Sequence, residues 1–336
     1  MTVACDDGAA ADSTADAASE SSGDSGSDGD GTADSGSGGQ TGGGEALLHE
    51  GQPGSFFENL AIAPDGGVVF SDLTGRAVLR FDEDSGVRTL AAIDDSPAGL
   101  AFDVDGTLYV TAFRESILEL DDPFVASCRV WRIDADGDAT VVADAPQAGM
   151  LNGIERVAPG VFLVADSSAG TIWRLDADSG ALAPWLQDDR LEAVAGLVAP
   201  GANGLHLRDG VLWIANSGRA PLGRIAIDDA GAPAGPLEIA MTGVVVDDFA
   251  FAASGEIYAA THLSDVIRID PDGAWSALAV PQDLLAGPTS LVFGHGEHDR
   301  ASIYVVSDGG LFFHRDEPTA AAAARLVRIA LDEVGP

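Results

Sequence analysis

Two short patterns recur six times along this chain of 336 residues, and their spacing constrains the fold more than any other feature. The first pattern is an apolar residue, any residue, arginine, a second apolar residue and then an Asp- or Gly-rich turn. Its copies, two of which contain a slight insertion, are "VLRFDEDSG", "VWRIDADGD", "IWRLDADSG", "GRIAIDDAG", "VIRIDPDGA" and "LVRIALDEVG". Alternating apolar and polar residues followed by turn residues predict a β-strand that enters a hairpin.

The second pattern lies upstream of each copy of the first and contains a short strand, a glycine turn and a more apolar strand. Its six copies start at Glu58, Ala98, Asn152, Asn203, Asp247 and Thr289, which gives spacings of 40, 54, 51, 44 and 42 residues. Together with the arginine-containing strand and one weaker strand, each unit has about four strands. Four-stranded units that repeat at this period are typical of a β-propeller. We therefore predict an all-β, six-bladed propeller with four antiparallel strands per blade.

The composition divides the chain into two parts. Residues 1–44 consist mostly of Gly, Ser, Asp, Ala and Thr, with acidic side chains and no basic one. Such a segment cannot bury enough apolar surface to fold, so we expect a disordered acidic tether. Residues 45–336 should form the propeller. The sixth unit ends without a fourth strand, and we expect "EALLHEG", from Glu45, to supply it and close the ring, since an open ring would leave an unpaired edge.

The starting residues of the six units should form a ring at one mouth of the central channel. The first strand of each blade is innermost, so these residues gather around the axis although they are far apart in sequence. Four of the six have side-chain oxygens: Glu58, Asn152, Asn203 and Asp247. Hard oxygen donors with a net charge near −2 suit Ca²⁺, with Mg²⁺ or Mn²⁺ as alternatives. Asn-Gly and Asp-Asp also build ordinary turns, so the alternative is that these residues have no ligand.

The end of each second strand should return to the same mouth, because the first two strands of a blade are antiparallel. This places Asp72, Arg114, Asp166, Asn216, His262 and Asp308 near the ring. We consider Arg114 and Asp166, with Asn152, as substrate-binding candidates. Proton transfer could involve Asp247 or its neighbour Asp248, with His262 as the next candidate.

The formal net charge is −37, and all 17 basic residues are Arg. A nucleic acid or an anionic membrane surface is therefore an improbable partner, because like charges repel. We expect a small-molecule substrate and a monomer. Cys5 follows "TVA" and precedes the acidic segment, as at the end of a bacterial lipoprotein signal, although the preceding apolar segment is missing from this sequence. A lipid anchor at Cys5 would make the protein extracytoplasmic, and a cytoplasmic location is the alternative.

From about residue 45 onward the chain resembles the senescence-marker-protein/gluconolactonase (regucalcin-like) group of six-bladed propellers. The motifs are "FFENLAIAPDGGVVFSD", "LNGIERVAPGVFLVAD", "ANGLHLRDGVLWIANS" and "DDFAFAASGEIYAATH". The resemblance implies a divalent metal held by Glu58, Asn203 and Asp247, with Asn152 beside it. Blade one departs from the group's Glu-Gly-Pro with Glu58-Asn59-Leu60. Met150 stands where the group commonly has an arginine that binds sugar-acid lactones.

Two functions are consistent with these features. In the first, the protein is a metal-dependent hydrolase of a lactone or related ester, and the cation polarises the substrate carbonyl. In the second, it is a non-catalytic, calcium-stabilised binding or scaffold propeller displayed on the cell surface, since a fold does not by itself imply an activity. The chain contains no Gly-x-Ser-x-Gly motif, so a serine nucleophile is not indicated.

Overall fold

A computed structural model describes residues 44–116, 118, 127–194, 199–219, 222–228, 230–263, 265–278, 280–281, 284–314 and 317–336. The residues from Gly42 onward form one compact unit. Nearly all of the predicted tether, including Cys5, lies outside the described residues. No helix in the described ranges has the length and apolar character of a membrane span.

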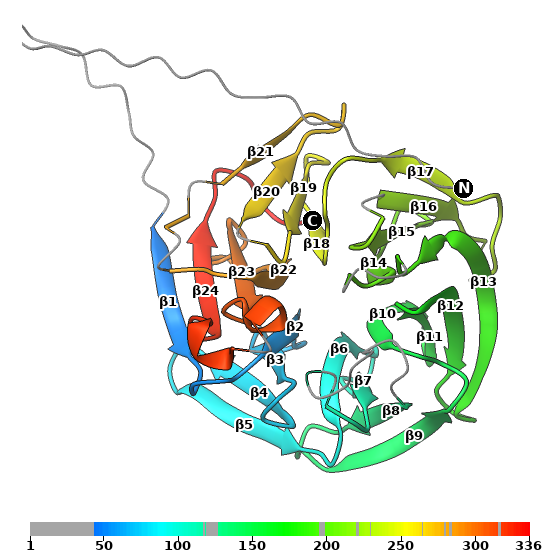
Figure 1. Cartoon of the computed structure of the whole chain (residues 1–336), viewed down its shortest axis with the longest axis horizontal. Helices are drawn as coiled ribbons and strands as arrows, with labels where there is room; N and C mark the ends of the chain where they lie inside the picture. The colour runs from blue at the N-terminus through cyan, green and yellow to red at the C-terminus, as the bar shows by residue number, and fades with distance from the viewer. Residues whose placement is uncertain are drawn as a thin grey trace, which may run out of the picture. The chain divides into compact units, whose positions relative to one another are not determined.

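The compact unit is a six-bladed β-propeller, as predicted from the repeats (Figure 1). The first three blades contain β2 (Phe57–Ile62), β3 (Val68–Asp72), β4 (Ala77–Asp82) and β5 (Gly86–Ala92); β6 (Ser96–Phe102), β7 (Leu108–Phe113), β8 (Cys128–Ile133) and β9 (Ala139–Ala145); and β10 (Leu151–Ala158), β11 (Val161–Asp166), β12 (Ala169–Asp176) and β13 (Ala181–Glu192). The strands of each blade pair antiparallel in sequence order.

The last three blades repeat this arrangement. They contain β14 (Ala202–Arg208), β15 (Val211–Asn216), β16 (Leu222–Ala226) and β17 (Glu238–Met241); β18 (Phe249–Phe251), β19 (Ile257–Ala260), β20 (Val266–Ile269) and β21 (Trp275–Ala277); and β22 (Pro288–Phe293), β23 (Ser302–Ser307), β24 (Arg325–Ala330) and β1 (Glu45–Glu50). Two short 3₁₀ segments, η2 (Leu311–His314) and η3 (Pro318–Ala320), lie between β23 and β24.

The ring closes through the N-terminal strand, as expected from the sequence. β1 pairs antiparallel with β24 and forms the outer edge of blade 6, with Glu45 opposite Ile329 and Glu50 opposite Arg325. An ion pair between Glu50 and Arg325, at 2.8 Å, lies beside the same pairing. Blade 6 therefore combines the two ends of the propeller sequence.

The hydrophobic core lies between the blades. Six clusters of buried side chains join neighbouring blades, and the cluster between blades 2 and 3 also includes Phe56, Leu73, Leu311 and Phe312. The cluster between blades 1 and 2, for example, packs Val69 and Val78 against Leu100 and Val110. Because each strand is apolar on the face that meets the next blade, burial between blades stabilises the ring as a whole.

Candidate functional site

Each blade has a one-residue β-bulge at the position predicted to line the channel mouth. In blade 1, Phe57 faces Asp72 but Leu60 faces Phe70, so β2 contains one extra residue. Blades 2, 3, 4 and 6 show the same shift. In blade 5, Asp247 N donates to Ala260 O and Ala260 N donates to Asp248 O, so two residues again face one. Bulges redirect side chains and are frequent beside functional sites.

Glycines at the bulges of blades 2 and 3 permit close contact between neighbouring first strands. A β-carbon on Gly99 would lie 2.3 Å from Asn152 O, and one on Gly153 would lie 2.3 Å from Asn203 O. Neither glycine has a positive φ. They are required because any side chain would collide with the next blade.

A hydrogen bond crosses every blade boundary beside the bulges. Five of the donors are buried hydroxyls and the sixth is a backbone amide. The bonds are Ser71 Oγ to Ala98 O, Thr111 Oγ1 to Asn152 O, Ser167 Oγ to Ala202 O, Ser217 Oγ to Val246 O, His262 N to Pro288 O and Thr289 Oγ1 to Phe57 O. This circular set of bonds fixes the positions of the ring residues relative to one another.

The ring brings the four predicted oxygen donors to one mouth, all of them buried. Asn203 Nδ2 donates to Asp247 Oδ1 and, at 3.1 Å, to Ser217 Oγ. Ser217 Oγ also donates to Asp247 Oδ1, at 3.2 Å. Within the described part of the chain, the ring atoms Glu58 Oε2, Asn152 Nδ2 and Asp247 Oδ2 are buried without a hydrogen bond of normal geometry.

Glu58 is a buried acidic residue whose Oε2 has no hydrogen-bond partner. Burial and the nearby charge of Asp247 raise the pKa of Glu58 to about 8, and the positive charge of His262 opposes this effect. Burial and the charge of Asp247 both disfavour the ionised form of Glu58. A cation at the mouth would lower this pKa and supply the missing partner of Oε2.

His262 bridges two carboxylates at the same mouth. Its Nδ1 lies 2.9 Å from Asp247 Oδ2, and its Nε2 lies 3.2 Å from Asp308 Oδ2. Burial lowers the pKa of His262, but Asp247 and Asp308 together raise it well above its usual value. The imidazole is therefore held in its charged form between the two carboxylates.

Aromatic side chains enclose His262. Ring centroids of Phe56, Phe312 and Phe313 lie 6.1, 5.2 and 5.3 Å from the imidazole centroid. Phe313 and the neighbouring Leu263 are both more than half exposed. The outer surface of this mouth is thus apolar, whereas the ring beneath it is polar.

Asp248 belongs to the channel and shares no partner with Asp247. Its Oδ1 lies 2.9 Å from His206 Nε2, and its Oδ2 accepts from Ser290 Oγ at 2.5 Å and Asn59 Nδ2 at 3.1 Å. Asp248, His206, Asn59 and Glu155 line a channel cavity of about 290 Å³. Burial lowers the pKa of His206, but Asp248 raises it overall.

The other predicted substrate-binding residues lie at the mouth but have different surroundings. Asp166 is fully buried, and its two oxygens accept hydrogen bonds from Gly149, Met150, Ser168 and Trp173. Its geometry therefore stabilises a turn and leaves no oxygen directed at a ligand. Arg114 has an exposed side chain, and its backbone amide donates to Ser127 O.

The donors present fit a divalent cation. The described residues contain no group of three or more His, Cys, Asp or Glu arranged to hold a metal. Two carboxylates and two amides nevertheless meet at the ring, and oxygen-only sets of this kind suit hard cations. The unpartnered Glu58 Oε2 is the observation that favours a missing cation. Sequence reasoning placed Asp308 at this mouth but missed its bond to His262, which lies in a different blade.

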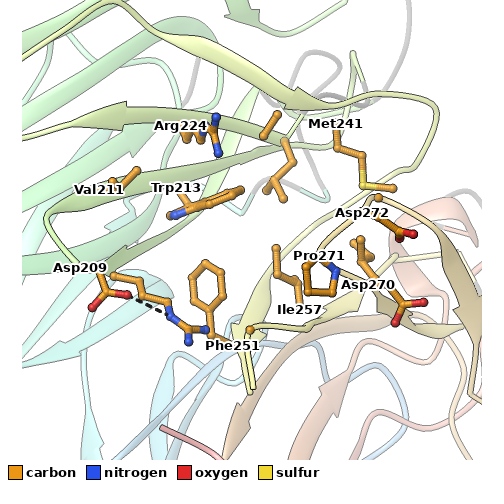
Figure 2. Close-up of a pocket in the computed structure, with 16 residues that line it drawn as sticks. Asp209, Val211, Trp213, Arg224, Met241, Phe251, Ile257, Asp270, Pro271 and Asp272 are labelled. Atoms are coloured by element: carbon orange, nitrogen blue, oxygen red, sulfur yellow. Dashed lines mark ion pairs between the residues drawn. The ribbon is translucent and has the colours of Figure 1, made fainter. Parts of the chain in front are cut away.

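A separate pocket of about 410 Å³ lies between blades 4 and 5, at the opposite end of their first strands (Figure 2). Trp213, Phe251 and Ile257 line it, and Asp209 pairs with Arg208 at its edge. A comparable pocket of about 350 Å³ lies between blades 1 and 2. Because the groove recurs with the blade repeat, we attribute it to propeller geometry.

Comparison with known proteins supports the fold. No protein-family model matches the chain. A curated relative, a putative hetero-Diels-Alderase from Phoma sp, is 24% identical over 308 residues, which are 78% of this chain and 86% of that protein.

Similar solved structures include a luciferin-regenerating enzyme, the calcium-binding protein regucalcin from Agrobacterium tumefaciens and a gluconolactonase from Xanthomonas campestris. Their TM-scores are 0.67, 0.64 and 0.62, and their identities are 14%, 17% and 18%. The matches cover 88%, 88% and 85% of this chain and 98%, 96% and 89% of those chains. The chain therefore has the propeller fold of gluconolactonase- and regucalcin-type proteins, which its sequence motifs resemble.

Proposed function

We propose that this propeller binds a divalent cation at the ring and hydrolyses a lactone or a related ester there. The main supporting observation is Glu58, a buried carboxylate with an unpartnered oxygen beside Asn152, Asn203 and Asp247. Such a group is costly to bury unless a positive charge compensates it. The gluconolactonase and the calcium-binding regucalcin among the similar structures support the same proposal.

Glu58, Asn203 and Asp247 would hold the cation, with Asn152 beside them. A bound divalent cation supplies Lewis-acid polarisation of a substrate carbonyl. Burial of the ring side chains keeps the donor oxygens in fixed positions, so that little reorganisation is needed when a substrate binds. Ca²⁺ is the cation that we propose, because all the donors are hard oxygens.

Asp247 is the group that we propose to accept the proton from an attacking water. It is joined to His262, and His262 to Asp308, so the proton would be shared along a chain of three groups. Asp248 receives no role, because its oxygens contact His206, Ser290 and Asn59 and none of the proposed cation ligands. Phe312 and Phe56 would limit the access of bulk water.

The test combines binding and activity. Calorimetric titration with CaCl₂ should show binding to the wild-type protein and at least tenfold weaker binding to Glu58→Gln. Hydrolysis of a panel of lactones and aryl esters should fall to background with a chelator and recover with excess Ca²⁺. Hydrolysis that continues unchanged in chelator, or in Glu58→Gln, would contradict the proposal.

A second candidate function follows from the apolar mouth. Phe313 and Leu263 expose apolar surface next to the ring. The curated relative is named as a putative hetero-Diels-Alderase. The alternative is therefore cation-independent cyclisation, or simple binding, of an apolar compound. Binding of an apolar fluorescent probe that persists in chelator, without any ester hydrolysis, would favour it.

A further inference from the structure

We propose that His262 and Asp308 are positioning residues that orient the Asp247 carboxylate as a cation ligand. This inference rests on the proposed function, because it assigns a role in cation binding at the same ring. Ligating carboxylates in metal sites are often fixed by hydrogen bonds from a second layer of residues. Here that layer comes from two blades, with His262 following β19 and Asp308 following β23.

The two oxygens of Asp247 have separate tasks. Oδ1 faces the ring, where Asn203 and Ser217 approach it. Oδ2 is also buried, and its neighbour is His262 Nδ1, at an ion-pair distance of 2.9 Å. A carboxylate fixed through one oxygen presents the other in a single orientation, so the contact with His262 determines where Oδ1 points.

His262 is itself held in an unusual backbone conformation. Its φ is +59°, a left-handed value that a non-glycine residue seldom adopts and that costs energy. Its backbone amide donates to Pro288 O at 2.7 Å, across the boundary to blade 6. Packing against Phe56 and Phe312 fixes the ring plane. Surrounding contacts thus impose the conformation that directs Nδ1 at Asp247.

Asp308 completes the arrangement from the opposite side. It is fully buried, its Oδ1 accepts from Gly310 N at 2.6 Å, and its Oδ2 accepts from Phe312 N at 2.8 Å. The same Oδ2 contacts His262 Nε2 at 3.2 Å. Asp308 therefore ties the imidazole to the η2 segment, which also supplies Phe312 and Phe313.

The chain contains a matched control. His206 contacts Asp248 at 2.9 Å, the same distance that separates His262 from Asp247, and the two aspartates are consecutive. Asp248, however, faces the channel and contacts none of the proposed cation ligands. If His262 acts by orienting Asp247, removal of His206 should not weaken cation binding.

The experiment is calorimetric titration of the full-length protein with CaCl₂. We expect His262→Ala to weaken binding by about 10–100-fold, the effect typical of residues that orient metal ligands. His262→Asn should retain most of the affinity, because its amide can replace the Nδ1 donor. His206→Ala should bind within about threefold of the wild type.

The outcomes separate this inference from the proposed function. Absence of binding to the wild type, or normal binding to Glu58→Gln, overturns the proposed function and this inference with it. Suppose that the wild type binds Ca²⁺ and Glu58→Gln does not. Binding to His262→Ala that is as tight as in the wild type, or tighter, then overturns only the positioning role. Thermal melting without Ca²⁺ identifies variants that do not fold. If His262→Ala is one of them, Asp308→Asn replaces it, and unchanged affinity in that variant also overturns the role.

Discussion

Glycine at the bulges has a steric function that its neighbours in the sequence do not reveal. The pair Asn152-Gly153 resembles a hairpin turn, yet Gly153 lies where a β-carbon would be 2.3 Å from Asn203 O of the next blade. The obstacle is backbone, which cannot move without shifting β14. Close packing between strands, rather than a special dihedral angle, therefore requires glycine here.

Replacing Gly153 with alanine should destabilise the propeller. We expect the free energy of unfolding to fall by about 1–3 kcal/mol or more, as for other overpacked positions. Gly235→Ala is the control, because a β-carbon there has no atom within 4 Å and its φ is not positive. That variant should be neutral or more stable by about 0.4–1 kcal/mol. Equal urea midpoints for the two variants would refute the steric explanation.

Cys128 should be an unreactive thiol. It is 2% exposed, and burial raises its pKa to about 12. Because the thiolate is the reactive form, alkylation at pH 8 should be about a thousandfold slower in the folded protein than in denaturant. The measurement uses iodoacetamide and mass spectrometry on Cys5→Ser, which leaves Cys128 as the one remaining cysteine. Rapid labelling of the folded variant would show that this region opens.

Hydroxyls at the end of the second strands join neighbouring blades. Thr111 Oγ1 donates to Asn152 O at 2.7 Å and accepts from Gly99 N at 2.8 Å, and the residue is fully buried. We expect Thr111→Val to cost about 1–3 kcal/mol, because two buried backbone groups lose their partner. Thr140→Val, at an exposed position of β9, removes only a solvent-exposed hydrogen bond from Arg132 Nε, at 3.1 Å, and should leave the unfolding midpoint nearly unchanged. A neutral Thr111→Val would show that these bonds contribute little.

The N-terminal strand should matter more for stability than its exposure suggests. β1 covers the edge of β24, which would otherwise present unpaired backbone groups to solvent. Deletion of residues 1–50 should cost about 0.5–1.5 kcal/mol for each backbone hydrogen bond lost and promote aggregation. Deletion of residues 1–43, which keeps β1, serves as the control. Similar melting and light scattering for both truncations would argue against closure by this strand.

The elements were predictable where the sequence repeats and unpredictable where blades contact each other. The repeats indicate the six blades, and the shared register of Glu58, Asn152, Asn203 and Asp247 predicts that they meet at one mouth. Asp247 contacts His262 and Asp248 contacts His206 because the two residues form a bulge opposite Ala260. The sequence pattern of one blade does not reveal which way each side chain points at such a bulge. The contact between His262 and Asp308 crosses from blade 5 to blade 6, so its distance follows only from the folded ring.

The whole molecule has a large excess of negative charge, which affects any cation experiment. With a net charge of −37, repulsion between acidic side chains destabilises the compact state. Any salt weakens this repulsion by screening the charges. An increase in melting temperature with CaCl₂ alone would therefore not establish a specific site. Glu58 provides the distinction, because its substitution by Gln removes one ring carboxylate and changes the net charge by only one unit.

We expect CaCl₂ to raise the melting temperature of the wild type more than NaCl does at equal ionic strength. A free Ca²⁺ concentration of 100 times the dissociation constant adds about 2.7 kcal/mol to the free energy of unfolding. Each kcal/mol raises the melting temperature by about 2–4 °C in domains somewhat smaller than this one. Glu58→Gln should keep the shift caused by NaCl, because screening acts on the whole charged surface. It should lose the additional shift caused by Ca²⁺, because ligation takes place only at the oxygens of the ring. An additional Ca²⁺ shift that is equal in both proteins would assign the effect to the acidic surface and remove the ring from consideration.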